Sequence, residues 1–462
     1  MGRELHDLKQ TSGQAKKAVR FRMHRPSPRR IGILAGGRSL PIEIAQGLRA
    51  RGVDVHIVAI EGEADPALDV FHPETLNWGQ IGGIVASFKK AGCQQVAIAG
   101  SVSRPDLSTI KPDLGFFRAI PTVLQLIRAG GDDAILRGVI GFFEKRGLEI
   151  IGVSQVAPEL LVGLGTFSGP QHQREDMDDI RTGFEVLQVL APFDVGQAVV
   201  VADGRIEAIE GAEGTDRMLD RLSQQRHAKM RARAPVGGGI LIKAPKPGQE
   251  LRVDMPAIGP ETVRKSAGAD LKGIAVEAGR VLAIDRAALQ DMAVSHRVFV
   301  AGVRPSEFAN SEAMVGVGPA EAFSSDDMTV RQLGRRRLRA GDIADASKGA
   351  KLISALAGFD TARAVVLSRR HVLAVEAGEG IIETIDRAAQ LRQWGGGGLF
   401  GRRSGVAVLA IARDLDAAVI ASAADAGLAG VAVVLQKFAA GVGDGAIALA
   451  DQRNLFIAAV AG

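Results

Sequence analysis

The sequence predicts an α/β protein in three structured parts: a parallel-sheet domain followed by two copies of a different α/β domain. Short apolar runs alternate with helical patterns over the first 165 residues, as in proteins whose parallel strands are joined by helices. The pattern then changes to a strand hairpin flanked by helices, and this second pattern recurs later in the chain. A chain of 462 residues is long enough for each part to bury its own core.

The first part is predicted to be a Rossmann-like domain over residues 31–165. Its first strand is IGILAG, which ends at two glycines and precedes the helical pattern PIEIAQGLRARG. The strands VDVHIVAI and QQVAIAG, the helix IGGIVASFKKAG between them, and a last strand LEIIGV complete the pattern. In such a sheet the ligand crevice lies at the carboxyl ends of the strands.

The second part, residues 166–303, is predicted to be an α/β domain of another kind. A helical pattern over 175–190 leads into the hairpin QAVVVADGRIEAIE, a charged helix and the strand-like GIAVEAGRVLAID. We expect helices and strands of this domain to pack on one core.

The second domain occurs twice. Segments 180–222 and 346–388 align without a gap at a constant offset of 166, since 346 − 180 = 166, and about a third of their positions are identical. The match resumes at 268–279 and 425–436, after a slip of nine residues. We therefore expect a second copy over 346–462.

The second copy has lost polar residues. Thr215 and Asp216 of EGTD correspond to Ile381 and Ile382, and Asp254 corresponds to an isoleucine in the later register. The segment KAPKP has no recognisable counterpart. The losses favour a live site in the first copy and a degenerate second copy, although surface residues also drift after any duplication.

The charge distribution points to solvated segments. The net charge is +5, and many basic residues lie in the first thirty residues and in TVRQLGRRRLRAGD at 329–342. We interpret residues 1–30 as a disordered basic extension and 304–345 as a basic linker, with weak attraction to a membrane surface as another option. The absence of Tyr and the presence of only two Trp count against stacking on nucleic acid.

The single cysteine, Cys93, excludes an internal disulfide and a cysteine-rich metal site. No long apolar stretch predicts a membrane-spanning helix, and the start of the chain lacks a signal-peptide pattern. These features predict a cytoplasmic protein.

Two loops of the first domain are suited to an anion. AGGRSLP places Gly36, Gly37, Arg38 and Ser39 where a strand turns into a helix. AGSVSRP follows a later strand of the same sheet and offers Gly100, Ser101 and Arg104. Because both loops follow parallel strands, we expect them at one sheet edge, holding a phosphate or nucleotide. A tight turn without a ligand is the alternative for the first loop.

Carboxylates and lysines provide further candidates. GGDDAILR places Asp132 and Asp133 where a helix should begin, so that capping competes with binding as their role. EGTD supplies Glu213, Thr215 and Asp216 for a sugar or a divalent ion. KAPKPGQELRVD supplies Lys243 and Lys246, followed by Asp254, on a segment that its prolines keep from being helical.

Cations followed by a carboxylate suit the cleavage of a pyrophosphate. Positive charge offsets the developing negative charge, and a carboxylate can orient water or hold Mg²⁺. The metal candidates are Asp254 and Asp216.

The ordered series of motifs from AGGRSLP through GGDDAILR and GAEGTDRML to KAPKPGQELRVDMPAIG resembles the LpxI family of UDP-2,3-diacylglucosamine pyrophosphatases, over residues 31–303. The resemblance implies substrate binding between a Rossmann-like domain and a family-specific C-terminal domain. It implies Mg²⁺-dependent hydrolysis of UDP-2,3-diacylglucosamine to UMP and 2,3-diacylglucosamine 1-phosphate, with water attacking the sugar-side phosphorus, in lipid A biosynthesis.

The resemblance also identifies Asp254 as the essential aspartate. It implies a homodimer and, through the lipid substrate, a location peripheral to the inner membrane. A copy fused in the same chain can occupy the dimer surface, so the homodimer stays open.

Two other function classes stay open at this point. One is a non-catalytic nucleotide- or lipid-binding regulator derived from the same family, because duplication followed by decay can produce such proteins. The other is a nicotinamide oxidoreductase, against which it counts that VAI, the end of the second strand, does not close with an acidic residue for the ribose.

Overall fold

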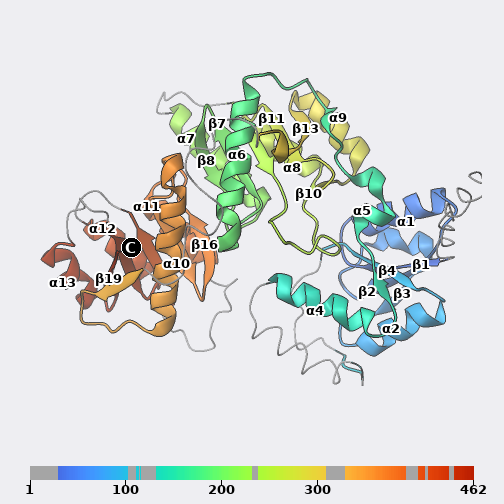
Figure 1. Cartoon of the computed structure of the whole chain (residues 1–462), viewed down its shortest axis with the longest axis horizontal. Coiled ribbons are helices and arrows are strands. Elements are labelled where there is room, and N and C mark those ends of the chain that lie inside the picture. The colour runs from blue at the N-terminus through green and yellow to red at the C-terminus, as the bar shows by residue number, and fades with distance from the viewer. Residues whose placement is uncertain are drawn as a thin grey trace, which may run out of the picture.

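The computed structural model describes residues 30–101, 111–113, 115, 132–231, 238–308, 328–391, 404–410, 415–435 and 442–461. The extension 1–30 lies outside these residues except for Arg30. Three domains follow one another along the chain, coloured blue to teal, green to yellow, and orange to red in Figure 1.

The N-terminal domain is a five-stranded parallel sheet in the order β3-β2-β1-β4-β5. Its strands are β1 (Arg30–Ala35), β2 (Asp54–Ile60), β3 (Glu74–Leu76), β4 (Gln95–Ala99) and β5 (Glu149–Ile150). Its α-helices are α1 (Leu40–Ala50), α2 (Ile81–Lys90), α4 (Asp132–Glu144) and α5 (Val153–Val156), and 3₁₀ turns cover Pro66–Phe71 and Pro158–Leu160.

The strand order reverses between β1 and β4, and in sheets of this kind ligands commonly bind at the carboxyl ends of the strands at such a point. Alternate residues of the buried strands face two different cores. Ile33 and Ala97 pack towards α1 and α5, whereas Val58 and Val96 pack towards α2 and α4. The predicted Rossmann-like domain is confirmed.

The first copy of the second domain is a six-stranded mixed sheet in the order β6-β13-β11-β9-β7-β8. The strands are β6 (Gly165–Ser168), β7 (Ala198–Ala202), β8 (Arg205–Ile209), β9 (Ile240–Lys243), β11 (Gly273–Glu277) and β13 (Phe299–Val303). The helices are α6 (Asp176–Leu190), α7 (Thr215–Arg231), α8 (Pro260–Gly268) and α9 (Arg286–His296), with 3₁₀ turns at Ala191–Phe193 and Pro305–Glu307.

A small parallel pair, β10 (Ala257–Ile258) and β12 (Leu282–Ala283), links this copy to the N-terminal domain. Leu282 is buried in the core under β1 and α1, and it forms an isolated bridge with Leu161. The N-terminal domain and the first copy therefore share packed apolar contacts.

The second copy repeats the sheet as β14-β19-β18-β17-β15-β16. Its strands are β14 (Thr329–Gln332), β15 (Ala364–Ser368), β16 (His371–Val375), β17 (Val406–Leu409), β18 (Gly430–Val434) and β19 (Phe456–Ala461). Its helices are α10 (Ala340–Leu356), α11 (Ile381–Leu391), α12 (Ala417–Asp425) and α13 (Asp444–Gln452), with a 3₁₀ turn at Ala357–Phe359. The duplicated domain predicted from the sequence is present, and β10 and β12 have no equivalent among its described residues.

The residues predicted to be a linker belong partly to this copy. β14 pairs with β19 as β6 pairs with β13, and α10 begins at Ala340, so the copy begins inside the segment 304–345. The physical reason is that β14 is an edge strand with exposed polar residues and lacks the apolar alternation of a buried strand.

The two copies form a layered unit. α6 and α10 lie between the two sheets, and α7 to α9 and α11 to α13 cover the outer faces (Figure 1). The inner layer is one continuous apolar cluster with residues from both copies. In both copies a glycine lets the inner helix approach its sheet: a Cβ on Gly183 would lie 2.5 Å from Ile242, and one on Gly349 would lie 2.5 Å from Val408.

Candidate active site

Three buried polar side chains of the first copy form a hydrogen-bonded chain between the end of β9 and the start of α7. The ammonium of Lys243, the last residue of β9, donates to the Thr215 hydroxyl at 2.9 Å. Thr215 begins α7 and its hydroxyl donates to Oε1 of Glu210 at 3.0 Å, and Oε2 of Glu210 accepts from the backbone N–H of Gln197 at 2.6 Å. All three side chains of the chain Lys243–Thr215–Glu210 belong to buried residues.

This arrangement leaves the lysine ready for an anion. Lys243 is only 9% exposed, and among the described residues no carboxylate lies within ion-pair distance of its Nζ. An ammonium has three donors, and burial of an uncompensated charge is costly. Because Glu210 reaches the lysine only through the hydroxyl, the positive end of the chain can receive a ligand anion.

The second copy keeps the carboxylate of this polar chain and lacks its hydroxyl and its ammonium. Glu376 stands where Glu210 does and accepts from the Arg363 amide at 3.1 Å, as Glu210 accepts from Gln197. Thr215 and Lys243 are replaced by Ile381 and Leu409, which pack in the core of the second copy. The carboxylate therefore serves the fold in both copies, whereas the hydroxyl and the ammonium are particular to the first.

Asp254 lies on the loop from β9 to β10, and this loop reaches the N-terminal domain. Asp254 is exposed, and its Oδ2 accepts from the Gln249 side-chain amide at 2.6 Å. On either side of it, Val253 packs against the core beneath α2 and α4, and Met255 packs against the core beneath α1. The carboxylate is thus held at the boundary between the two domains.

Arg252 anchors the same loop. Its guanidinium bonds Glu250 at 2.8 Å and Glu144 of α4 at 2.9 Å. These bonds raise the pKa of Arg252, and the arginine in turn lowers the pKa of Glu250. Arg252, held by Glu250, thus docks this loop on the N-terminal domain through Glu144.

Lys246 is engaged elsewhere. Its ammonium forms an ion pair of 2.5 Å with Asp194, which has a left-handed backbone after α6. Lys348 of the second copy lies close enough for both charges to act on it, although burial is the main reason that its pKa is lowered. The structure therefore separates Lys246 from the chain of Lys243 and places it against the second copy.

Glu213, predicted as a substrate contact, lies in the interface between the copies. Its carboxylate accepts from Arg221 at 3.1 Å and from Arg387 of the second copy at 2.9 Å. Asp216 is half-buried in the first turn of α7, and no described contact joins it to Asp254. Of the three EGTD candidates, only Thr215 belongs to the buried polar chain.

The two predicted loops of the N-terminal domain do meet at one sheet edge. Gly37 and Ser101 form a bridge in which the Gly37 amide donates to the Ser101 carbonyl at 2.7 Å, with a return bond of 3.0 Å. The Gly36 amide donates to Ala99 at 2.8 Å, and a Cβ on Gly100 would lie 2.7 Å from the Gly37 carbonyl. These amides donate to backbone carbonyls of the neighbouring loop and strand, so the close approach of the loops accounts for the glycines.

The remaining N-terminal candidates differ in what they can contribute. Arg38 is exposed with a φ of 69°, and the Ser39 hydroxyl donates to Glu43 at 2.8 Å. Arg104 lies outside the described residues. Asp132 and Asp133 form the start of α4, and their side chains lie outside the described part of the structure.

No metal cluster is present among the described residues, in the sense of three or more His, Cys, Asp or Glu placed to hold an ion. Asp254 remains a single hard oxygen donor. Mg²⁺ commonly binds proteins through one or two carboxylates and completes its shell with water and substrate phosphates, so Asp254 fits such a site, and no described contact links Asp216 to it.

Sequence reasoning missed two participants in the site. Glu210 stands out in the sequence only as a position shared by the repeats, and no pattern marks Gln249, which orients Asp254. The retention of Glu210 as Glu376 signals a structural role but not its link to Thr215.

Comparison with known proteins assigns this chain to a family. The model of the LpxI N-terminal domain matches residues 30–160, and that of the LpxI C-terminal domain matches twice, at residues 163–301 and 330–458. The chain belongs to the LpxI family. It is similar to the UDP-2,3-diacylglucosamine pyrophosphatase LpxI of Caulobacter vibrioides, with 40% identity over 279 residues that cover 60% of this chain and 99% of the relative. The LpxI relative therefore corresponds to the N-terminal domain and one C-terminal copy.

Among the described residues, no helix combines the length and apolar character needed to span a bilayer.

Proposed function

We propose that this protein hydrolyses the pyrophosphate bond of UDP-2,3-diacylglucosamine to UMP and 2,3-diacylglucosamine 1-phosphate, as a step of lipid A biosynthesis. The observation that carries the proposal is the buried Lys243 ammonium, which is held by Thr215 and Glu210 without a direct carboxylate partner among the described residues. The similarity to a pyrophosphatase of that name over almost its full length supports the choice of substrate.

Lys243 binds the pyrophosphate in this proposal. Thr215 orients the ammonium, and Glu210 keeps the hydroxyl in place by accepting its hydrogen bond. The positive end of the α7 dipole adds to the attraction for an anion, because Thr215 is the first residue of that helix. As the bond to UMP breaks, Lys243 stabilises the negative charge that develops on the phosphate oxygens.

Asp254 directs the water. Its carboxylate is held through Oδ2 by the Gln249 amide, in a loop docked on the N-terminal domain. Water attacks the sugar-side phosphorus, the bond to the bridging oxygen breaks, and UMP leaves with that oxygen. Asp254 orients the water and can accept its proton. Mg²⁺ is part of the proposal: Asp254 would hold it together with substrate phosphates, and the bound ion would polarise the phosphoryl oxygens.

The test is the release of UMP from UDP-2,3-diacylglucosamine and Mg²⁺ by the full chain, compared with Asp254→Asn. We expect a loss of at least about a hundredfold in kcat for this variant, in line with the contribution of general-base catalysis. The control is Asp425→Asn, which changes an exposed carboxylate of the second copy and should leave turnover unchanged.

Binding of the substrate without turnover by the intact chain would reject the hydrolase and favour a regulator. Equal turnover in wild type and Asp254→Asn would reject the role of Asp254. Because the substrate is a lipid, the same assay should use mixed micelles or vesicles.

A further inference from the structure

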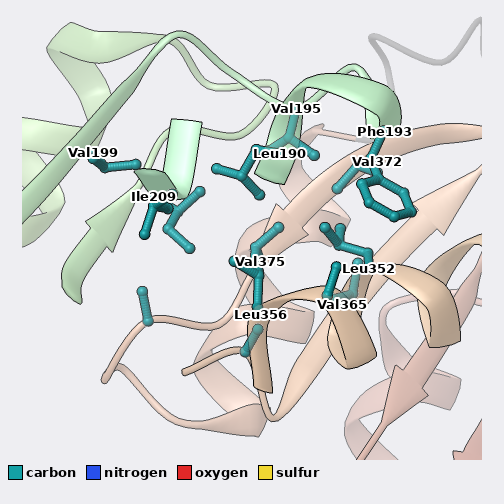
Figure 2. Close-up of a cluster of buried hydrophobic side chains, with 14 of the residues drawn as sticks. Leu190, Phe193, Val195, Val199, Ile209, Leu352, Leu356, Val365, Val372 and Val375 are labelled. Atoms are coloured by element: carbon teal, nitrogen blue, oxygen red, sulfur yellow. The ribbon is translucent and has the colours of Figure 1, made fainter. Parts of the chain in front are cut away.

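The contact between the two copies has the internal symmetry of a homodimer. The apolar cluster contains equivalent residues of the two copies, for example Leu190 and Leu356 or Val199 and Val365, at the offset of 166 that relates the copies (356 − 190 = 166). Figure 2 shows members of this cluster from both copies, with Leu190 and Val199 on the green ribbons and Leu356 and Val365 on the orange ribbons. An interface in which the same patch from two units meets itself is isologous, as in twofold dimers.

A buried quartet of charges repeats this symmetry. Arg221 bonds Glu213 at 3.1 Å and Glu379 at 3.4 Å, and Arg387 bonds Glu213 at 2.9 Å and also Glu379. Arg221 and Arg387 are equivalent residues, as are Glu213 and Glu379. The side chains are 13%, 11%, 4% and 2% exposed in the order Arg221, Arg387, Glu213, Glu379.

The symmetry extends to the backbone. Arg221 donates to the Ile209 carbonyl at 3.2 Å, and Arg387 donates to the equivalent Val375 carbonyl at 3.0 Å. Each arginine therefore ties the end of its own hairpin to the carboxylates of both copies. All of these contacts lie within one chain, although Glu213 Oε2 and the Nε atoms of both arginines are buried without a hydrogen-bond partner among the described residues.

The second copy also touches the loop that carries the proposed site. The Ala212 amide donates to the Leu373 carbonyl of the second copy at 3.1 Å, and Arg387 bonds Glu213 in the next position. Glu210 and Thr215 stand on either side of these two residues. Contacts from the second copy therefore fix the short segment that holds two members of the chain Lys243–Thr215–Glu210.

The second copy has no equivalent chemistry of its own at these positions. Ile381 and Leu409 replace the hydroxyl and the ammonium, while Glu379, Arg387 and the apolar contacts are retained. What persists is the contact surface, and what is lost is the polar chain.

We infer that the second copy is a built-in partner subunit, which covers the isologous surface of the first copy within one chain and positions its segment 210–215. Arg387 is the positioning residue: it acts through Glu213 and does not contact the substrate. The role of this segment in turnover rests on the proposed function. The chain is accordingly a monomer with one site.

The first measurement is the mass of the full-length protein in solution by light scattering. We expect the mass of one chain across micromolar concentrations. A stable dimer would overturn the built-in partner, whatever the activity of the protein.

The second measurement follows amide hydrogen exchange of residues 210–216 in Arg387→Met and in Arg387→Lys, which keeps the charge if the methionine variant fails to fold. The control is Arg363→Met, because Arg363 pairs with Glu376 of its own copy. We expect at least about tenfold faster exchange in Arg387→Met, partial rescue by lysine and no change in the control. Unchanged exchange of 210–216 in both Arg387 variants would overturn the positioning role.

The third measurement is kcat and KM for UMP release, taken where each variant is folded. A fall in kcat that exceeds the change in KM for Arg387→Met, with Arg363→Met unaffected, supports positioning. Unchanged kcat alongside a lowered thermal midpoint would reduce Arg387 to a structural residue. If wild type releases no UMP, the proposed function fails, while the mass and the exchange data still decide the inference.

Discussion

The substitution Glu213→Gln separates the two roles that Glu213 could have. The sequence predicts a substrate contact, whereas the structure places this carboxylate between two arginines, with its side chain 4% exposed. Glutamine keeps the shape of the side chain and removes its charge. Arg221 and Arg387 are then left with Glu379 as their only carboxylate in the quartet.

The expected loss of stability is large. Removing one partner of a buried ion pair destabilises by about 3–5 kcal/mol, because a charge stays buried without compensation. At about 1.4 kcal/mol per decade, this corresponds to a hundredfold or greater rise in the population that has lost the contact between the copies. For domains of this size we expect the thermal midpoint to fall by on the order of 10 °C.

The assay is thermal unfolding followed by circular dichroism, with UMP release measured well below the midpoint. The control is Glu175→Gln, at an exposed position before α6. An unchanged thermal midpoint together with abolished substrate binding would refute this reasoning and restore Glu213 as a substrate contact.

Three further predictions concern single contacts. Lys243→Met should abolish turnover while changing the free energy of unfolding by less than about 1 kcal/mol, because the second copy folds with Leu409 at the equivalent position. The measurements are the rate of UMP release and urea unfolding, with Lys90→Met at an exposed position as the control. Burial raises the pKa of Glu379, but the charges of Arg221 and Arg387 outweigh burial, so the pKa of Glu379 in the folded protein is lowered. The ionised Glu379 carboxylate therefore stabilises the fold fully above its ordinary pKa of 4.5, and this stabilisation is lost as the pH falls through the folded-state pKa. The difference in thermal midpoint between wild type and Glu379→Gln should therefore shrink in acid. Gly349→Val should cost about 1–3 kcal/mol in urea unfolding because its Cβ would lie 2.5 Å from Val408, whereas Gly358→Val, with nothing within 4 Å, should cost less.

Much of the fold could be predicted because its signals are local or internal. The apolar runs of β1, β2 and β4 are buried strands, and the match between the two repeats is enough by itself to indicate the second copy. β14 could not be predicted, because an exposed edge strand carries arginine and glutamine where a core strand carries apolar residues.

Candidate site residues could be named from the sequence, but their arrangement could not be predicted. Lys243 and Thr215 are both candidates in the sequence, but they are 28 residues apart in the chain. Their contact depends on the pairing of β9 with its neighbouring strands and on the position at which α7 begins. The burial of Glu213 between two arginines could not be predicted, because it depends on the second copy; its role as a substrate contact stays a prediction. A usable signal exists: Glu213 and Arg221 are retained as Glu379 and Arg387, whereas Thr215 and Lys243 are lost.

The most direct test of the central claim exchanges one residue between the copies. Thr215→Ile gives the first copy the residue of the second, and Ile381→Thr does the reverse; UMP release is measured for both in the full chain. A single live site in the first copy predicts at least about a hundredfold loss for Thr215→Ile and wild-type turnover for Ile381→Thr. Wild-type turnover by Thr215→Ile, or a comparable loss in Ile381→Thr while it remains folded, would contradict the account.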